Sequence, residues 1–321
     1  MTSPMVTRHS SCKSLCINPP GLAPENAMSR FLSFSLSLLF LSSFAAGQQH
    51  EREFWRSIAK SNYAVPASES ADALAPELSA LLGSPDPELR DDLAYSILGT
   101  WILHGQLSSS SLISLSDEWK SNLKSGIGET GTNSVLKRSF SALCLSEAAK
   151  REARSPFMGA LRYHDLVAQA IEYLQAERDL RGYDAVLHWI HATAHTADLL
   201  GALANSPMLT KEEASSILRA IAARLSTAPQ VYTQGEQDRL AAAAVSVIRR
   251  KDFDKSFFDG WLTGIQDEDR NVWANTTVES LAHYQNHNYL LQALTVRLSL
   301  EDPNPAAEQF RKAVLKLLAD R

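Results

Sequence analysis

After residue 50 the sequence contains no segment with the apolar–polar alternation of a β-strand, and this limits the folds open to the chain. Residues of high helix propensity dominate instead, and Gly and Pro stand mainly where helices should end. Two Pro-containing connections, at 84–87 and 302–305, each combine a helix stop with the next helix start. Thr210 and Glu213 have the spacing of a capping box. The sequence therefore predicts an all-α protein.

The linkers between the predicted helices are short, which makes successive helices antiparallel neighbours. We expect an array of antiparallel helical hairpins, either a HEAT-like α-solenoid or a compact curved α/α superhelix. The predicted helices cover residues 51–61, 71–82, 87–104, 110–124, 133–153, 163–180, 184–204, 211–226, 235–250, 253–265, 271–283, 287–300 and 305–319.

Residues 28–47 have the pattern of a secretory signal peptide. Arg30 precedes an apolar run, and Ala45 and Gly47 fit a small-residue cleavage site before Gln48. The run is shorter than the about 20 residues of a membrane span, so no stable span is expected after cleavage. The pattern predicts an exported protein, periplasmic or secreted.

The segment 1–27 is polar and unpatterned, so we expect a non-native or disordered extension there. Translation could start at Met1 or at Met28. The remaining residues, 48–321, are predicted to form a single all-α domain, because they are numerous enough to bury a sizeable core.

The charge balance argues against nucleic acid as a partner. The full chain has a formal net charge of −5, and the part after residue 47 has 28 basic and 35 acidic residues. A nucleic-acid-binding protein would show a basic footprint instead. Of the three cysteines, Cys12, Cys16 and Cys144, only the last would remain after cleavage, so no internal disulfide is expected.

Residues 184–204 predict a helix that is apolar on almost every side, which is typical of a central, buried helix. Four ionisable side chains nevertheless share one arc of about 100° on this predicted helix. They are His188, His191, His195 and Asp198. Because unpaired buried polar groups cost several kcal/mol, these side chains must find partners.

Three kinds of partner are open to this group. The side chains can form a structural hydrogen-bond network, with Asp198 orienting an imidazole. They can contact a small molecule or peptide together with Trp189. They can also bind a divalent metal such as zinc, because His191, His195 and Asp198 are an acceptable ligand set. The metalloprotease motif is absent, since Ala192 occupies the position of its glutamate base.

A second histidine pair, His283 and His287, lies where the sequence predicts a helix end. Its better interpretation is a solvated helix terminus, but both residues could join a metal site if the two histidine pairs converged. There is no Gly-rich phosphate loop and no Gly-x-Ser-x-Gly elbow, and no pattern indicates a Ser–His–acid triad.

The central motif carries a family resemblance. It reads Arg181-Gly-Tyr183, then Trp189-x-His191-x-x-Ala194-His195-x-x-Asp198-Leu-Leu200. It resembles the hallmark of DUF2785, a family of uncharacterised bacterial proteins, over about residues 70–320. The chain departs from that pattern at His188, where glycine is expected. The resemblance implies an all-α fold and no assigned activity, cofactor or substrate.

Two functions compete on these residues. The first is an exported helical-repeat protein that binds or scaffolds a ligand through His191, His195 and Asp198. The second is a metal-dependent hydrolase of the cell envelope that uses the same side chains as metal ligands. The sequence leaves open which of the two applies, as well as the ligand and the oligomeric state.

Overall fold

The computed structural model describes residues 50–300 and 305–321. The predicted signal peptide and the segment before it lie outside these residues. Within them the chain is helical apart from one two-stranded hairpin, so the prediction of an all-α fold is confirmed. No helix in this described part is long and apolar enough to cross a membrane.

The elements follow one another with short connections. They are α1 (Arg52–Lys60), α2 (Ala71–Leu81), the π-helix η1 (Glu88–Tyr95), α3 (Ser96–Leu103), α4 (Ser109–Asn122), α5 (Ser134–Arg154), α6 (Gly159–Ala176), β1 (Tyr183–Asp184), β2 (His188–Trp189), α7 (Ala192–Ala204), α8 (Lys211–Ser226), α9 (Glu236–Ile248), α10 (Lys255–Asp269), α11 (Val278–Leu300) and α12 (Pro305–Ala319).

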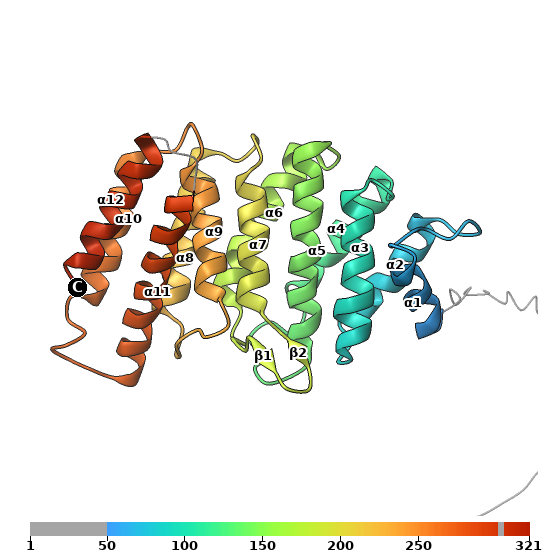
Figure 1. The fold of residues 1–321 in the computed structure, drawn as a ribbon, viewed down its shortest axis with the longest axis horizontal. Coiled ribbons are helices and arrows are strands. Elements are labelled where there is room, and N and C mark those ends of the chain that lie inside the picture. Colours follow the sequence, from blue (N-terminus) through green and yellow to red (C-terminus); the bar gives the residue numbers. More distant parts are fainter. Residues whose placement is uncertain (1–49, 301–304) are drawn as a thin grey trace, which may run out of the picture. The chain divides into compact units, whose positions relative to one another are not determined.

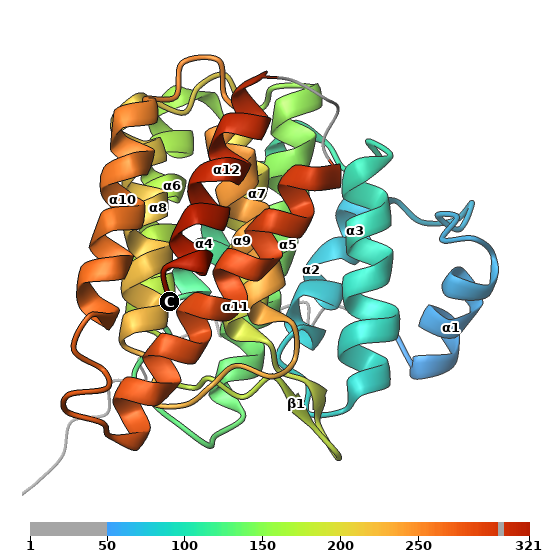
Figure 2. The same ribbon diagram turned by 60° about the vertical axis from the view of Figure 1, so that its left-hand side comes forward.

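Among the described residues, the helices from α2 to α11 form two rows (Figure 1). Helices α3, α5, α7, α9 and α11 pack side by side in one row, and the even-numbered helices α2 to α10 form the row behind it. Figure 2 shows α10 beside α8, with α12 packed against α10 and α11. Because the helices alternate in direction, the hairpin and the start of α11 lie at the same end of the rows.

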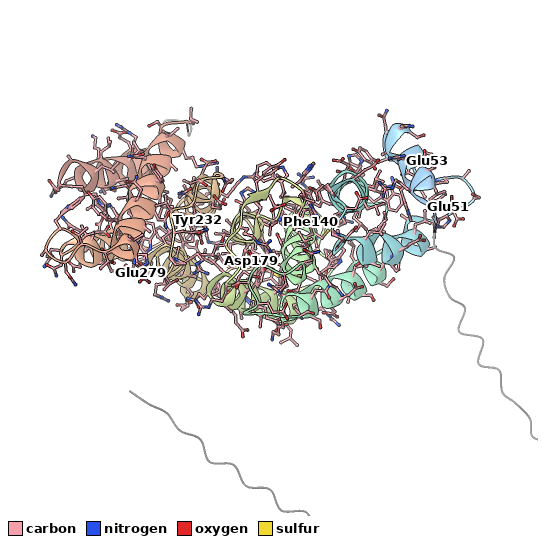
Figure 3. The ribbon with its side chains drawn as sticks, turned by 90° about the horizontal axis from the view of Figure 1, so that it is seen from below. Glu51, Glu53, Phe140, Asp179, Tyr232 and Glu279 are labelled. Atoms are coloured by element: carbon pink, nitrogen blue, oxygen red, sulfur yellow. The ribbon has the colours of Figure 1, made fainter. Side chains whose placement is uncertain are left out.

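Helix α7 is the central, buried helix that the sequence predicts. It packs against α5, α6 and α9. Gly201 allows the close approach to α9, because a Cβ atom at this position would lie 3.4 Å from the Ala243 Cα atom. Figure 3 labels Phe140, Asp179 and Tyr232, which lie in this middle part of the array.

The predicted helix 184–204 is wrong in its first half. Residues 183–189 form the hairpin β1–β2, and the helix begins only at Ala192. The Asp184 carboxylate accepts the backbone N–H groups of Val186 and Leu187, both at 2.8 Å, which makes a turn in place of a helix start. His191 then adopts a left-handed backbone with φ 51°, so it precedes α7.

The predicted break between 271–283 and 287–300 is also wrong, because α11 runs unbroken from Val278 to Leu300. Asn286 lies in the predicted break, and asparagine often caps a helix or forms a turn. Its buried amide instead accepts the Tyr232 N–H at 2.9 Å and donates to the Gln230 carbonyl at 3.0 Å. His283 and His287 therefore lie on successive turns of one helix.

Candidate functional site

The hairpin presents a stack of aromatic rings to solvent. The Trp189 ring lies almost parallel to the His191 ring, with centroids 4.8 Å apart and an interplanar angle of 24°. Tyr183 meets the Trp189 ring edge-on at 5.0 Å, and His188 stacks on Tyr183 at 5.7 Å. Trp189 and Tyr183 are 43% and 49% exposed, so the outer part of the stack is open to solvent.

A fully buried arginine of η1 fixes the position of this hairpin. Arg90 donates to the backbone carbonyls of Leu187 at 2.6 Å and Trp189 at 3.2 Å, and to Ser84 at 2.9 Å. Its guanidinium also lies over the Phe140 ring, 4.8 Å from the centroid. Hydrogen bonds from a charged donor are the stronger kind, so Arg90 makes the exposed stack rigid.

His191 forms the inner layer of the stack and is held as a neutral ring. Its Nε2–H donates to the Gln234 carbonyl at 3.1 Å, and Nε2 lies 3.6 Å from the Glu236 carboxylate. Burial lowers the pKa of His191 to about 4. Burial also raises the pKa of Glu236, which accepts the Gln234 N–H. Gly182 permits this arrangement, because a Cβ there would lie 2.5 Å from the Glu236 carboxylate.

His195 lies one turn into α7 and is also neutral. Its Nδ1 is 2.8 Å from the Ser139 hydroxyl, and that hydroxyl donates to the Ile190 carbonyl. Since Ser139 has one hydroxyl hydrogen, His195 must donate from Nδ1. Burial holds the pKa of His195 well below its usual value, and the neighbouring His191 acts in the same direction.

Asp198 was expected to orient an imidazole ring, but its partner is an arginine. Its carboxylate accepts two hydrogen bonds from Arg239 of α9, at 2.7 and 2.9 Å. Burial raises the pKa of Asp198, while Arg239 opposes that shift. Asp198 therefore forms an ion pair between α7 and α9.

The predicted site residues are brought together only in part. Trp189, His191 and His195 form one continuous cluster, with the two imidazole centroids 5.7 Å apart. His287 belongs to a separate cluster on α11, so the two histidine pairs do not converge. In residues 50–300 and 305–321, no group of three or more His, Cys, Asp or Glu side chains is placed to hold a metal ion.

Sequence reasoning missed the partners that hold this cluster. Arg90, Ser139 and Gln234 reach it from η1, α5 and the loop before α9. Their separation along the chain is large; Arg90 and Trp189, for example, are 99 residues apart. A π-helix such as η1 is often found at functional sites, but its sequence carries no signal by which it could have been predicted.

Comparisons with known proteins give one family. A family model described as "Protein of unknown function (DUF2785)" matches residues 123–296, more than half of the chain. This range contains the hairpin and α7, and it confirms the family resemblance predicted from the central motif. No curated protein and no solved structure matches the chain.

Proposed function

The chain belongs to the DUF2785 family, and we propose that it is an exported binding protein whose ligand stacks on the hairpin. The observation that carries the proposal is the exposed Trp189 ring lying flat on the buried, neutral His191 ring. A large aromatic ring that is exposed and rigid offers contact area at a low cost in conformational entropy.

The chemistry of the stack favours an uncharged ligand with a flat face. Trp189 and Tyr183 are both exposed, with ring planes 75° apart, and two exposed aromatic rings suit a pyranose ring or an aromatic side chain. His191 adds no charge beneath Trp189, because its burial keeps it neutral at physiological pH. A small saccharide or a peptide with an aromatic side chain fits these features.

The arrangement of the helices supports a scaffold role for the rest of the chain. The two rows suit a HEAT-like α-solenoid, and in repeat proteins insertions between helices often form loops on one face that binds. The hairpin is such a loop, between α6 and α7. Export remains part of the proposal and depends on residues 28–47 of the sequence.

Saturation-transfer NMR tests the proposal with two probes, tri-N-acetylchitotriose and the tripeptide Ala-Trp-Ala. We expect transfer to at least one probe from the wild-type protein and its loss in Trp189→Ala. Trp273→Ala is the matched control, because Trp273 is also exposed but lies outside the hairpin. No transfer to either probe, or transfer that persists in Trp189→Ala, would contradict the proposal.

A further inference from the structure

Three side chains from three helices form a hydrogen-bonded relay at the hairpin end of the rows. The Ser226 hydroxyl, at the end of α8, lies 3.2 Å from Nε2 of His287 on α11. Nδ1 of the same ring lies 3.0 and 3.1 Å from the two carboxylate oxygens of Asp269, at the end of α10. Each imidazole nitrogen thus has a different partner, a hydroxyl on one side and a carboxylate on the other.

The fold holds His287 and Asp269 firmly. His287 is completely buried, and its neighbour Asn286 is bonded to the loop that connects α8 and α9. Asp269 is also paired with Arg321, whose guanidinium donates to Asn288 at 2.6 Å. Because a carboxylate only accepts hydrogen bonds, His287 carries its hydrogen on Nδ1, and Nε2 faces the serine.

The relay opens into a pocket of about 380 Å³. Ser226, Asp269 and His287 line it, together with Asn271 and Asn275. His283, one turn before His287, also lines the pocket, and its Nε2 atom is buried with no hydrogen-bond partner among the residues that the structure describes. A buried polar atom without a partner at a pocket wall is a group that a ligand can satisfy.

We propose that Ser226, His287 and Asp269 form a nucleophile–base–orienting triad that hydrolyses an acyl ester or amide. The order of contacts, hydroxyl to Nε2 and Nδ1–H to carboxylate, is the geometry by which such triads are recognised on unrelated folds. This inference goes beyond the proposed binding function and does not depend on it. The two clusters are distinct, although His191 and Asn286, the neighbour of His287, both bond to the loop between α8 and α9.

The step balances within the pocket. The Ser226 oxygen attacks the acyl carbon while its hydrogen moves to His287 Nε2, and Asp269 stabilises the imidazolium that forms. His287 then gives that proton to the departing alcohol or amine as the acyl–heteroatom bond breaks. Water attacks the acyl-serine and gives a proton to His287, which passes it to the Ser226 oxygen as the acyl–oxygen bond breaks and the carboxylic acid leaves. Asn271 and Asn275, which line the same pocket, are the residues whose N–H groups this proposal assigns to the developing oxyanion.

Glu268 is a second acceptor for the Ser226 hydroxyl when no substrate is bound. The Ser226 hydroxyl also contacts the Glu268 carboxylate and the Ala222 carbonyl, so three acceptors compete for its one hydrogen. The Glu268 side chain is 53% exposed, and a substrate entering the pocket would displace it. The hydroxyl then directs its hydrogen to His287.

The test is covalent labelling of the full chain with a fluorophosphonate probe, followed by mass spectrometry of the labelled peptide. We expect a single adduct on Ser226, none in Ser226→Ala, and labelling slowed at least about 100-fold in His287→Gln. Ser216→Ala is the matched control, because Ser216 is a half-buried serine of the same helix whose hydroxyl bonds to the Glu212 carbonyl and to Arg219, both of α8.

Hydrolysis of p-nitrophenyl butyrate should follow the same order among the variants. Thermal melting shows whether His287→Gln folds. If it does not, the labelling rate of Asp269→Asn and the position of the adduct in the wild-type protein still test the proposal. A folded wild-type protein that takes no adduct, or takes it elsewhere than on Ser226, overturns the proposal. Labelling that is unchanged in a folded His287→Gln or Asp269→Asn protein also overturns it.

Discussion

The two histidine clusters of this molecule use the same side chain in opposite ways. At the start of α7, His191 and His195 each bond to an inner partner, a backbone carbonyl and the Ser139 hydroxyl, and a tryptophan covers His191. On α11, His287 joins a serine to a carboxylate at the wall of a pocket. The first cluster supports a rigid surface, while the second can move a proton.

The difference teaches that the partners of a histidine decide its chemistry. The sequence shows two His pairs with the same i, i+4 spacing. In the first, burial keeps both rings neutral beneath an aromatic surface. In the second, α8 and α10 end beside the same imidazole and bring Ser226 and Asp269 to it.

The largest expected effect comes from removing the arginine that holds the α7 cluster. Arg90→Met leaves the carbonyls of Leu187, Trp189 and Ser84 without their donor. We expect the free energy of unfolding to fall by about 3–4 kcal/mol, measured by urea denaturation. Arg239→Met is the control on a half-exposed arginine, and an equal loss in both variants would show that Arg90 has no special role.

The next effect is a pH dependence specific to the α7 cluster. His191 has a folded-state pKa of about 4 against a usual 6.5, so the unfolded chain binds its proton more tightly. The contribution of neutral His191 to the free energy of unfolding is therefore fully present above about pH 6.5. It decreases as the pH falls towards 4, by up to about 3 kcal/mol.

His191→Gln should reduce this pH dependence, leaving the part due to His195, whose pKa is lowered in the same sense. Thermal melting between pH 4 and 7 measures the effect. An identical pH profile in the wild-type and variant proteins would contradict the assignment of a buried, neutral His191.

The two serines provide a sharper contrast. Ser139→Ala leaves the Ile190 carbonyl and the His195 Nδ1–H buried without partners, so we expect a loss of about 2 kcal/mol. Ser226→Ala should cost less than about 1 kcal/mol, because that side chain is partly exposed at a pocket. Chemical denaturation of both variants gives the comparison, and a reversed order would contradict the roles assigned to the two clusters.

The smallest effect belongs to the ion pair of Asp198. Arg239 is half exposed, so solvent weakens the attraction between the two side chains. A double-mutant cycle with Asp198→Asn and Arg239→Gln should give a coupling energy of about 0.5–1 kcal/mol. A coupling above about 2 kcal/mol would place Asp198 among the groups that hold the α7 cluster.

The helices could be predicted because their signals are local. Apolar periodicity and the capping box at Thr210, which the structure confirms, fixed the element type and several ends. The hairpin was missed because a single carboxylate, Asp184, converts a helix-compatible segment into a turn. The unbroken α11 was missed because Asn286, usually a breaker, is satisfied by a distant loop.

The sites were less predictable because their partners come from far along the chain. Ser139 and His195 are 56 residues apart, and Ser226 and His287 are 61 apart. No local pattern connects such residues, so the sequence could select His191 and His195 but could not show what they contact. For the same reason it gave no sign of the Ser226–His287–Asp269 relay.

The central claim is that the two clusters hold their imidazole rings in different states. Long-range ¹H–¹⁵N NMR of the histidine side chains tests it directly. We predict that at pH 6 His191 is neutral with its hydrogen on Nε2, facing the Gln234 carbonyl, while His287 carries a hydrogen on Nδ1, facing Asp269. A His191 ring protonated on both nitrogens at that pH, or a His287 ring without a hydrogen on Nδ1, would contradict the account.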